Sequence, residues 1–414
     1  MRAVVLSGGG AKGAYEIGVW KALRQLDLSY EIVTGTSVGA LNGAFMVQKD
    51  YLHALWMWYH INFDMITSEK LSGNYKTFDG LKSIIKLYAK GVLEGGIYVT
   101  KLEHTMKEYI HPKKFYRSKI NYGLVTVNLS TLKPVELTKD QIPEDQLKDY
   151  LMASATCFPA FKKKQIGEET FIDGGYYDNL PIQLAIKMGA TEIIAVDLKA
   201  IGLKKKVKED IPITYIRPKT DLGSFLIFDK ELSRRAIRLG YLDTMKVYHK
   251  LEGEIITFKK GELLRNQRKY KEKMIDRMKE LFYLNDRGII KELLTVSKYN
   301  AFFKNSKKVE NEMEEILEYL GRAFELRDTK IYTLSSFQRE LKRKMKKLEP
   351  FEISQIEEKI KNKNLKNIRY SKTILQYLVQ KIEQQSEKDH AEFTMLALVL
   401  PKDMLAAIYI TLLS

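Results

Sequence analysis

Two successive units of strand, glycine-containing turn and helix fill the first fifty residues. The apolar run Ala3 to Leu6 leads through glycines into a helical stretch, Gly13 to Leu26, and Glu31 to Thr34 leads through a second turn into Val38 to Gln48. Strands that alternate with helices in this way predict an α/β fold on a mainly parallel sheet over residues 1–220. Further candidate strands are the β-branched runs Tyr122 to Asn128, Glu192 to Leu198 and Ile213 to Arg217.

The sequence changes after about Pro218, where strands give way to long, charged segments with helical apolar spacing. We therefore predict a mostly helical region over residues 221–414. Its role stays open between a lid, a membrane-docking surface and a partner module. One apolar stripe at helical spacing comprises Val309, Met313, Ile316, Leu320 and Phe324. The charged face of the same segment comprises Glu310, Glu314, Glu318 and Arg322.

The apolar stretch Phe393 to Leu413 has the length of a membrane span, but Pro401, Lys402 and Asp403 interrupt it. Burying a lysine and an aspartate in lipid is costly, so we expect a packed pair of helices instead. The N-terminal apolar run is too short for a cleaved signal peptide, and we expect no export by that route. Cys157 is the single cysteine of the 414 residues, which fits a reducing compartment. These features favour a cytoplasmic location.

The formal net charge is +17, and both parts of the chain are basic. Residues 1–220 hold 30 basic and 23 acidic residues (+7), and residues 221–414 hold 39 and 29 (+10). Such an excess attracts an anionic membrane, a nucleic acid or an acidic partner through salt-screened forces. Solvated lysine faces would account for it equally well. The run Lys162, Lys163 and Lys164 likewise fits either a solvated turn or a contact with lipid headgroups.

A glycine-rich turn follows the first strand directly and precedes a helix. Its backbone can approach a ligand closely, and amides at a helix N-terminus point at negative charge. The spacing alone fits either a phosphate cradle or an oxyanion hole. The turn comprises Gly8, Gly9, Gly10, Ala11, Lys12 and Gly13.

A second turn, between the strand Glu31 to Thr34 and the next helix, has the pattern of a nucleophile elbow. Its residues are Gly35, Thr36, Ser37, Val38 and Gly39. Small flanking residues permit a strained turn that presents the serine hydroxyl to a substrate. The alternative is a serine that only caps the helix.

A serine hydroxyl needs a neighbouring base to become a nucleophile. None of the six histidines sits in a glycine-bounded loop after a strand. Asp173 ends a short predicted strand and is followed by Gly174 and Gly175, which allow close approach to another loop. Asp178 lies nearby but lacks this context, so Asp173 is the candidate base.

These three motifs, with Asn179 and Pro181 after the aspartate, resemble the patatin-like phospholipases in order and placement. The resemblance covers roughly the first 220 residues. It implies a three-layer α/β/α sandwich, with Ser37 as nucleophile, Asp173 as base and backbone amides of the first glycine turn as the oxyanion hole. Lys12 stands where that family more often has arginine, and either cation preserves the local positive field.

The resemblance implies hydrolysis of carboxylic esters of phospholipids, of phospholipase A or lysophospholipase type, through a Ser37 acyl-enzyme without metal or cofactor. We expect a phospholipid or other acyl-ester substrate, peripheral contact with the inner face of an anionic membrane, and no nucleic acid. One alternative is a non-catalytic, basic lipid-binding protein on the same fold. Another is a nucleotide-binding oxidoreductase that uses the first glycine turn for a pyrophosphate and Glu31 for a ribose. The latter leaves the motifs at Ser37 and Asp173 unexplained.

Overall fold

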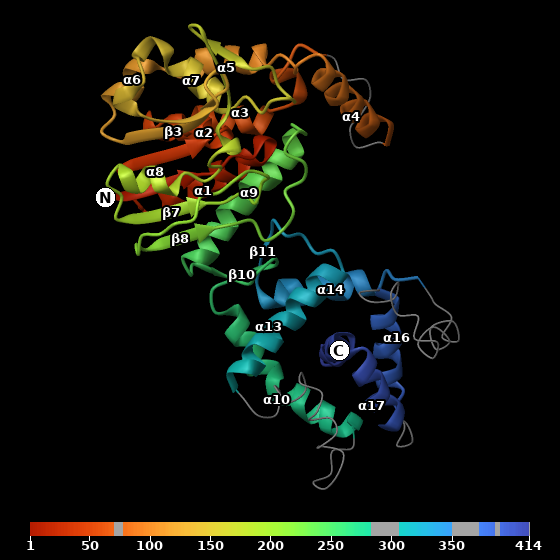
Figure 1. Ribbon diagram of the computed structural model, residues 1–414. Coiled ribbons are helices and arrows are strands. Elements are labelled where there is room, and N and C mark those ends of the chain that lie inside the picture. The colour runs from red at the N-terminus through yellow and green to blue at the C-terminus, as the bar shows by residue number, and fades with distance from the viewer. Residues whose placement is uncertain (70–77, 283–305, 350–371, 386–389, 414) are drawn as a thin grey trace. The chain divides into compact units, whose positions relative to one another are not determined.

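The computed structural model describes residues 1–69, 78–282, 306–349, 372–385 and 390–413 (Figure 1). Contacts within the chain define two compact units, Met1–Val247 and Tyr248–Ser414. Each unit has its own secondary structure and its own buried core, and the two are described in turn.

The first unit is built on an eight-stranded sheet with the order β5-β6-β3-β2-β1-β7-β8, in which β4 pairs with β3. The pairs β1–β2, β2–β3, β1–β7 and β7–β8 are parallel, which confirms the predicted α/β fold. Antiparallel pairing joins β3 to β4 and β6, and β6 to β5. The strands are β1 (Arg2–Leu6), β2 (Ile32–Thr36), β3 (Asn121–Asn128), β4 (Lys133–Thr138), β5 (Lys164–Ile166), β6 (Glu169–Asp173), β7 (Glu192–Val196) and β8 (Ile213–Ile216).

Helices cover both faces of this sheet and give the expected three layers (Figure 1). Side chains alternate between the faces of a strand. Ala3 and Val5 of β1 belong to the apolar cluster under α8 (Ile182–Lys187). On the other face, Gly43 of α2 (Val38–Val47) lies against Val33.

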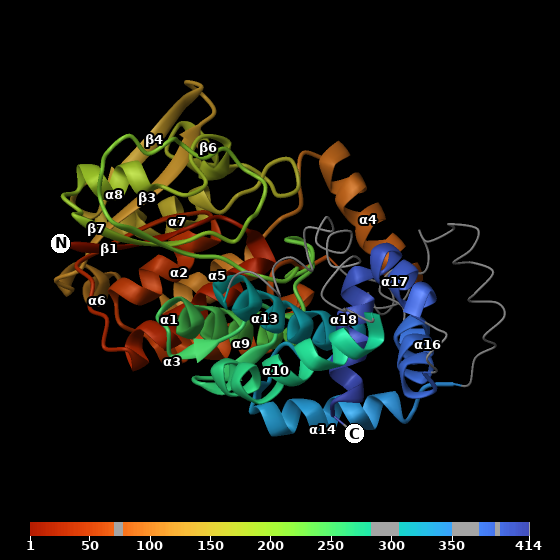
Figure 2. The same cartoon turned by 90° about the horizontal axis from the view of Figure 1, so that it is seen from below.

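Helices α1 (Ala14–Gln25) and α9 (Lys230–Val247) lie side by side in both views (Figures 1 and 2). A Cβ on Gly18 would lie 1.9 Å from the Ile237 carbonyl oxygen, and one on Gly240 would lie 2.0 Å from that of Tyr15. The two backbones therefore touch, and α9 belongs to the first unit although it follows the change in sequence character near residue 218. The remaining helices of this unit are α3 (Tyr51–His60), α4 (Phe78–Leu93), α5 (Thr100–Tyr109), α6 (Pro112–Arg117) and α7 (Leu147–Ser154).

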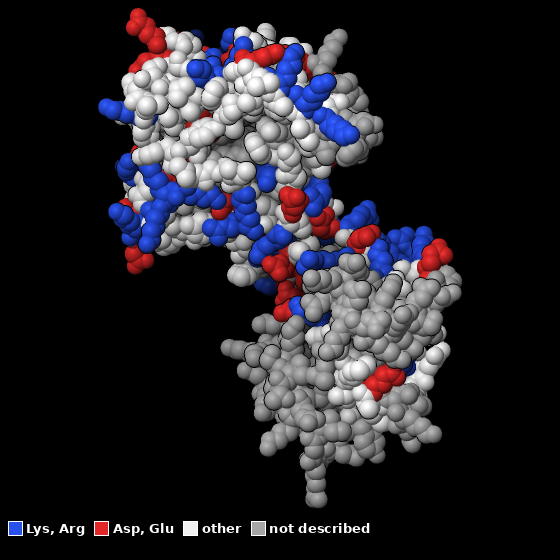
Figure 3. All heavy atoms as spheres, turned by 45° about the vertical axis from the view of Figure 1, so that its right-hand side comes forward, with Lys and Arg blue, Asp and Glu red and all other residues white. Residues whose placement is uncertain are grey.

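One face of the first unit carries more basic than acidic side chains (Figure 3). On the face that Figure 3 shows, a broad uncharged area is bordered by Lys and Arg side chains, with few Asp and Glu side chains among them. This distribution agrees with the charge of +17 for the whole chain.

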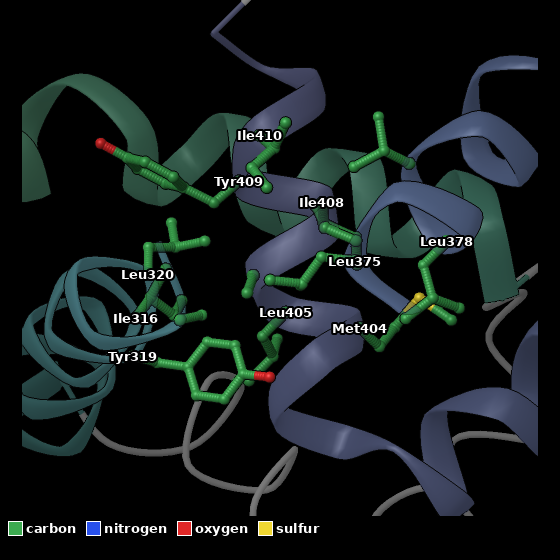
Figure 4. Close-up of a cluster of buried hydrophobic side chains, with 14 of the residues drawn as sticks. Ile316, Tyr319, Leu320, Leu375, Leu378, Met404, Leu405, Ile408, Tyr409 and Ile410 are labelled. Atoms are coloured by element: carbon green, nitrogen blue, oxygen red, sulfur yellow. The ribbon is translucent and has the colours of Figure 1, made fainter. Parts of the chain in front are cut away.

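The second unit is mostly helical, as the sequence predicts. Its last helix, α18, is its centre, because residues Met404 to Ile410 are all buried. Figure 4 shows Ile408 of this helix among side chains from α13 and α16. The helices are α10 (Glu262–Phe282), α13 (Ser306–Ala323), α14 (Leu334–Met345), α16 (Lys372–Glu383), α17 (His390–Val399) and α18 (Pro401–Thr411), and the short strands are β9 (Leu251–Glu252), β10 (Thr257–Lys259) and β11 (Ile331–Tyr332).

The apolar C-terminal stretch forms the predicted pair of helices, and Pro401 begins the second. Asp403 is buried and accepts a hydrogen bond from the Tyr319 hydroxyl, while Lys402 bonds Glu315 at 3.0 Å. Among the described residues, none of the helices combines the length and the apolar character that crossing a bilayer requires.

The predicted apolar stripe of α13 is buried at Met313, Ile316, Leu320 and Phe324, whereas the side chains of Val309 and Glu310 lie outside the described residues. Glu318 was expected to lie on the charged, solvent-exposed face of α13, but it contacts the backbone of another segment. Its carboxylate accepts hydrogen bonds of 2.7 to 3.2 Å from the amides of residues 254, 255 and 256. It therefore ties α13 to the turn before β10.

We predict that Gly18→Val lowers the free energy of unfolding of the first unit by about 3 kcal/mol, because the side chain must push α9 away from α1. Trp20, Trp56 and Trp58 are the three tryptophans of the chain and all lie in this unit, so their fluorescence during urea unfolding reports on it. Lys21→Ala, at an exposed position of the same helix, removes the contact of its ammonium with the Tyr241 ring, 5.4 Å from the ring centre, and should cost less than about 1 kcal/mol. Equal stability of the two variants would contradict the close α1–α9 contact.

Candidate active site

The turn at Ser37 joins β2 to α2 in a strained conformation. Ser37 has φ 56° and ψ −127°, a region that non-glycine residues rarely adopt. A Cβ on Gly35 would lie 2.3 Å from the Gly39 carbonyl oxygen, and one on Gly39 would lie 2.5 Å from that of Leu6. The two glycines therefore let the turn fold tightly onto the end of β1. Ser37 itself is 8% exposed and borders a pocket.

Ser154 holds this turn from the side. Its buried Oγ accepts a 2.9 Å hydrogen bond from the Ser37 amide and donates one of 2.7 Å to the Val125 carbonyl oxygen. The turn at Ser37 is thereby fixed to β3. The motifs in the sequence did not predict a role for Ser154. The small residues around it are the only sequence feature that could have indicated this close packing.

Asp173 ends β6 and is brought to Ser37 by another glycine contact. A Cβ on Gly174 would lie 2.1 Å from the Val125 carbonyl oxygen, so only a glycine lets the loop come this near. The Gly175 amide donates a 2.7 Å hydrogen bond to Asp173 Oδ1. Ser37 and Asp173, which the sequence singled out, are therefore neighbours.

Burial raises the pKa of Asp173 from its ordinary value of 3.8 to about 6. The Ser37 hydroxyl, within hydrogen-bonding reach, and the Gly175 amide act in the opposite direction and lower this pKa. The carboxylate is therefore ionised at neutral pH and has a hydroxyl proton within reach. Such a pair has the geometry of a nucleophile and its base.

Asp178 has a different environment. Its Oδ1 accepts hydrogen bonds from the amides of Leu180 and Lys205, and its carbonyl oxygen accepts one from the Thr36 hydroxyl. It does not border the pocket that Ser37 faces. Asp178 thus shapes the loop after Asp173.

The first glycine turn presents only some of its amides to the pocket. The amides of Gly8, Ala11 and Lys12 donate to the carbonyl oxygens of Asn179, Phe225 and Gly9 at 2.8 to 3.1 Å. Within the described part of the chain, the amides of Gly9 and Gly10 have no acceptor, and both residues border the pocket. These two are the available donors for an oxyanion. A Cβ on Gly13 would meet Val38, so that glycine lets the turn lie against α2.

The pocket has a volume of about 680 Å³ and lies wholly within the first unit. Its size is that of a site for a drug-sized or lipid-sized ligand. None of the six histidines borders it, and the described residues hold no cluster of three or more potential metal ligands. Besides Ser37, Asp173 and the glycine turn, its walls are largely apolar and include Met57, Trp58, Ile61, Ile66, Tyr88, Val92, Leu102, Phe158, Phe161, Ile201, Leu203 and Phe228.

Cys157 also borders this pocket and is partly exposed. Burial, with the nearby Asp173 charge, raises the pKa of its thiol to about 12. The thiol therefore stays protonated at neutral pH, as expected for a packed cysteine rather than a nucleophile.

The fold and the pocket define an α/β protein with a serine and a carboxylate at the base of an apolar cavity. Residues 4–186 match the family model described as patatin-like phospholipase. Residues 4–186 thus belong to the patatin-like phospholipase family, which confirms the resemblance seen in the sequence.

Relatives with curated descriptions match about half of this chain. Lysophospholipase nte1 of Aspergillus terreus is 28% identical over 203 residues, which are 48% of this chain and 12% of that protein. Patatin-like phospholipase domain-containing protein 6 of Mus musculus is 27% identical over 202 residues, 47% of this chain and 13% of that protein. The chain thus matches only a small part of these longer relatives.

Solved structures with a similar course of the chain include VipD from Legionella pneumophila and the type III effector protein ExoU. VipD has a TM-score of 0.35 and 14% identity, over 99% of this chain and 90% of its own. ExoU has a TM-score of 0.29 and 14% identity, over 98% of this chain and 76% of its own.

We predict that Gly10→Ala lowers kcat for a soluble ester by about 100-fold to 1000-fold, the loss typical of a misplaced oxyanion donor. Gly10 has φ +54°, and a Cβ there would lie 2.2 Å from the Phe225 carbonyl oxygen, so alanine must displace the turn. Gly9 has φ 167°, outside the left-handed region, and its nearest obstacle is the flexible tip of Leu198. Gly9→Ala should therefore keep kcat within about tenfold. Similar kinetics in the two variants would contradict this arrangement of donors.

Proposed function

We propose that this protein is a lipid acyl hydrolase that works through a Ser37 acyl-enzyme with Asp173 as its base. The observation that carries the proposal is the placement of Ser37, at positive φ, within reach of a buried carboxylate at the base of an apolar pocket. The family of residues 4–186 supports the same chemistry in general terms.

In the proposed reaction, the Ser37 hydroxyl loses its proton to Asp173 as its oxygen bonds to the acyl carbon. The carbonyl electron pair moves to oxygen, where the amides of Gly9 and Gly10 donate to it. Collapse of this intermediate expels the alcohol, which takes the proton from Asp173. A water molecule then attacks the acyl carbon as Asp173 accepts one of its protons. Collapse of this second intermediate releases a fatty acid, and Asp173 returns the proton to the Ser37 oxygen.

The pocket favours a substrate with a long acyl chain over a small polar ester. Its walls are largely apolar, and a buried methylene gains about 0.8 kcal/mol there relative to water. Phospholipids and lysophospholipids both offer such chains next to an ester bond. The name of the relative in Aspergillus terreus, a lysophospholipase, agrees with this substrate class.

The oxidoreductase alternative has a geometric difficulty. Glu31 precedes β2 and accepts a hydrogen bond from the Arg2 amide at the start of β1. The glycine turn lies beyond the other end of β1, about 17 Å away for a five-residue strand. A dinucleotide needs its acidic residue and its glycine turn at the same edge of the sheet.

We further propose that the protein acts in the cytoplasm and contacts the inner face of anionic membranes peripherally. The charge of +17 supports this location for the substrate, because basic residues are drawn to anionic lipid over about a Debye length.

We predict that Ser37→Ala and Asp173→Asn each reduce ester hydrolysis by at least about 1000-fold, since nucleophile and base act as one unit. A fluorophosphonate probe should label the wild-type protein at Ser37 and leave Ser37→Ala unlabelled. Asp178→Asn is the matched control and should keep most of the activity if the protein remains folded. Wild-type turnover in Ser37→Ala or Asp173→Asn would refute the proposed dyad, and labelling at a residue other than Ser37 would refute the assignment of Ser37 as the nucleophile.

The raised pKa of Asp173 predicts a pH dependence of activity. The base must be ionised, so kcat/KM should rise with pH and level off above about 6. The test is a pH profile on a soluble ester. A kcat/KM that falls as the pH rises through 6 would contradict the assignment of Asp173 as the base.

The same shift predicts a pH dependence of stability. A pKa raised in the folded state means that the protonated carboxyl favours folding; this contribution is complete below pH 4 and is lost as pH rises through about 6. Asp173→Asn lacks this contribution. Relative to wild type, the free energy of unfolding of the variant should therefore be about 3 kcal/mol higher at pH 8 than at pH 4. Asp178 has a similarly raised pKa, but it is present in both proteins and cancels in the comparison.

A further inference from the structure

Several apolar side chains of helix α4 are not buried against the rest of the first unit. Ile84 and Tyr88 face inward and are buried, whereas Ile85, Val92 and Leu93 have exposed fractions of 61%, 45% and 88%. In both views the helix extends away from the sheet (Figures 1 and 2). Single exposed apolar residues are common, but a contiguous group marks a surface that binds something.

The exposed residues of α4 are arranged in two neighbouring stripes. Ile85 lies seven residues before Val92, so these two share one side of the helix. Leu93, the last residue of α4, lies seven residues after Lys86 and so extends the apolar surface to the adjoining side. The second stripe consists of the exposed lysines Lys82, Lys86 and Lys90, each four residues from the next. An apolar stripe flanked by lysines is typical of helices that lie in the plane of a bilayer surface.

The loop after α4 extends this surface. Tyr98 is 57% exposed, and the Lys162 ammonium lies 3.8 Å from the centre of its ring. Lys163 beside it is also exposed. Lys164 is different, since it is paired with Glu103 and Asp149 at 2.9 and 3.0 Å and serves the interior of the unit.

The inner side of the same helix forms a wall of the active-site pocket. Tyr88 and Val92 both border the cavity, and the Tyr88 hydroxyl donates a 3.2 Å hydrogen bond to the Leu226 carbonyl oxygen. The Tyr88 ring also contacts those of Phe63 and Phe161. Val92 borders the cavity and belongs to the exposed stripe. The exposed stripe and the cavity are therefore adjacent.

We propose that α4, with Tyr98 and Lys162, is the surface through which this protein docks on a bilayer that contains anionic phospholipid. Ile85 and Leu93 enter the interfacial region, and the lysine stripe contacts the headgroups. This inference rests on the proposed function, because a lipid substrate would then pass from the bilayer along Val92 into the pocket. A bilayer is the occupant that fits both stripes, since one is apolar and the other basic on a chain of charge +17.

The test uses the full chain with Ser37→Ala, so that vesicles stay intact, and co-sedimentation with phosphatidylcholine vesicles containing roughly one third phosphatidylserine. Leu93→Glu should weaken binding by about tenfold or more, because a carboxylate replaces an inserted side chain. Lys86→Glu should weaken it by roughly thirtyfold, since two charge units are lost at about fivefold each.

The neighbouring residues Leu132 and Lys133 supply matched controls. Leu132 is 77% exposed and Lys133 is exposed, and both lie at the turn between β3 and β4. Leu132→Glu and Lys133→Glu replace the same two residue types by glutamate at a position outside α4. These variants should bind vesicles within about threefold of the parent. With Ser37 intact, all four variants should hydrolyse a soluble short-chain ester at the wild-type rate, which shows that they are folded.

Vesicle binding that is unaffected by Leu93→Glu and Lys86→Glu would overturn the docking surface, as would equal losses in the control pair or no binding by the parent. Failure of the proposed function has a different signature. A wild-type protein that neither hydrolyses the soluble ester nor reacts with a fluorophosphonate is no serine hydrolase, yet its vesicle binding still tests α4.

Discussion

The candidate active site depends on close contacts between backbones at positions where a side chain would prevent them. Gly39 lies against the Leu6 carbonyl, Gly35 against that of Gly39, and Gly174 against that of Val125. A Cβ at any of these positions would lie 2.1 to 2.5 Å from an oxygen, closer than real contacts allow. The ends of β1 and β2, the middle of β3 and the loop after β6 therefore converge only because the chain has glycine at each point of contact. Proteins place sites at such strand ends because several loops meet there.

The second requirement is a carboxylate that is buried without a cationic partner. Asp197 of the same unit shows the alternative: it is bonded to Lys204 and Arg217, and its pKa is lowered despite partial burial. A carboxylate held in that way is a weak base. Asp173 has a backbone amide and the Ser37 hydroxyl instead, so burial dominates and its pKa rises to about 6. The fold therefore gives up some stability at neutral pH to keep a carboxylate with a raised pKa beside Ser37.

Local patterns in the sequence predicted the parallel strands, the first two helices, the serine turn and the aspartate loop, because each is encoded by adjacent residues. The antiparallel strands β4 and β5 were missed, since neither contains a buried residue and β5 has only three residues. Contacts between distant residues were also beyond prediction. The Phe225 carbonyl occupies the Ala11 amide and so decides which loop amides remain available, and Ser154 anchors Ser37 from 117 residues away. The packing of α9 on α1 likewise depends on Gly18 and Gly240, whose spacing in the chain gives no local signal.

The docking role proposed for α4 has a basis in the energetics of moving a lipid. Taking a sixteen-carbon chain from a bilayer into water would cost about 12 kcal/mol at 0.8 kcal/mol for each methylene. Direct transfer into an apolar pocket avoids most of this cost, but only if the pocket opens at the bilayer surface. A helix with Tyr88 and Val92 toward the cavity and Ile85 and Leu93 toward the outside meets that condition. A small soluble ester has no such barrier. Under the proposed mechanism its hydrolysis would depend on Ser37, Asp173 and the glycine turn alone, whereas hydrolysis of a membrane lipid would depend on α4 as well.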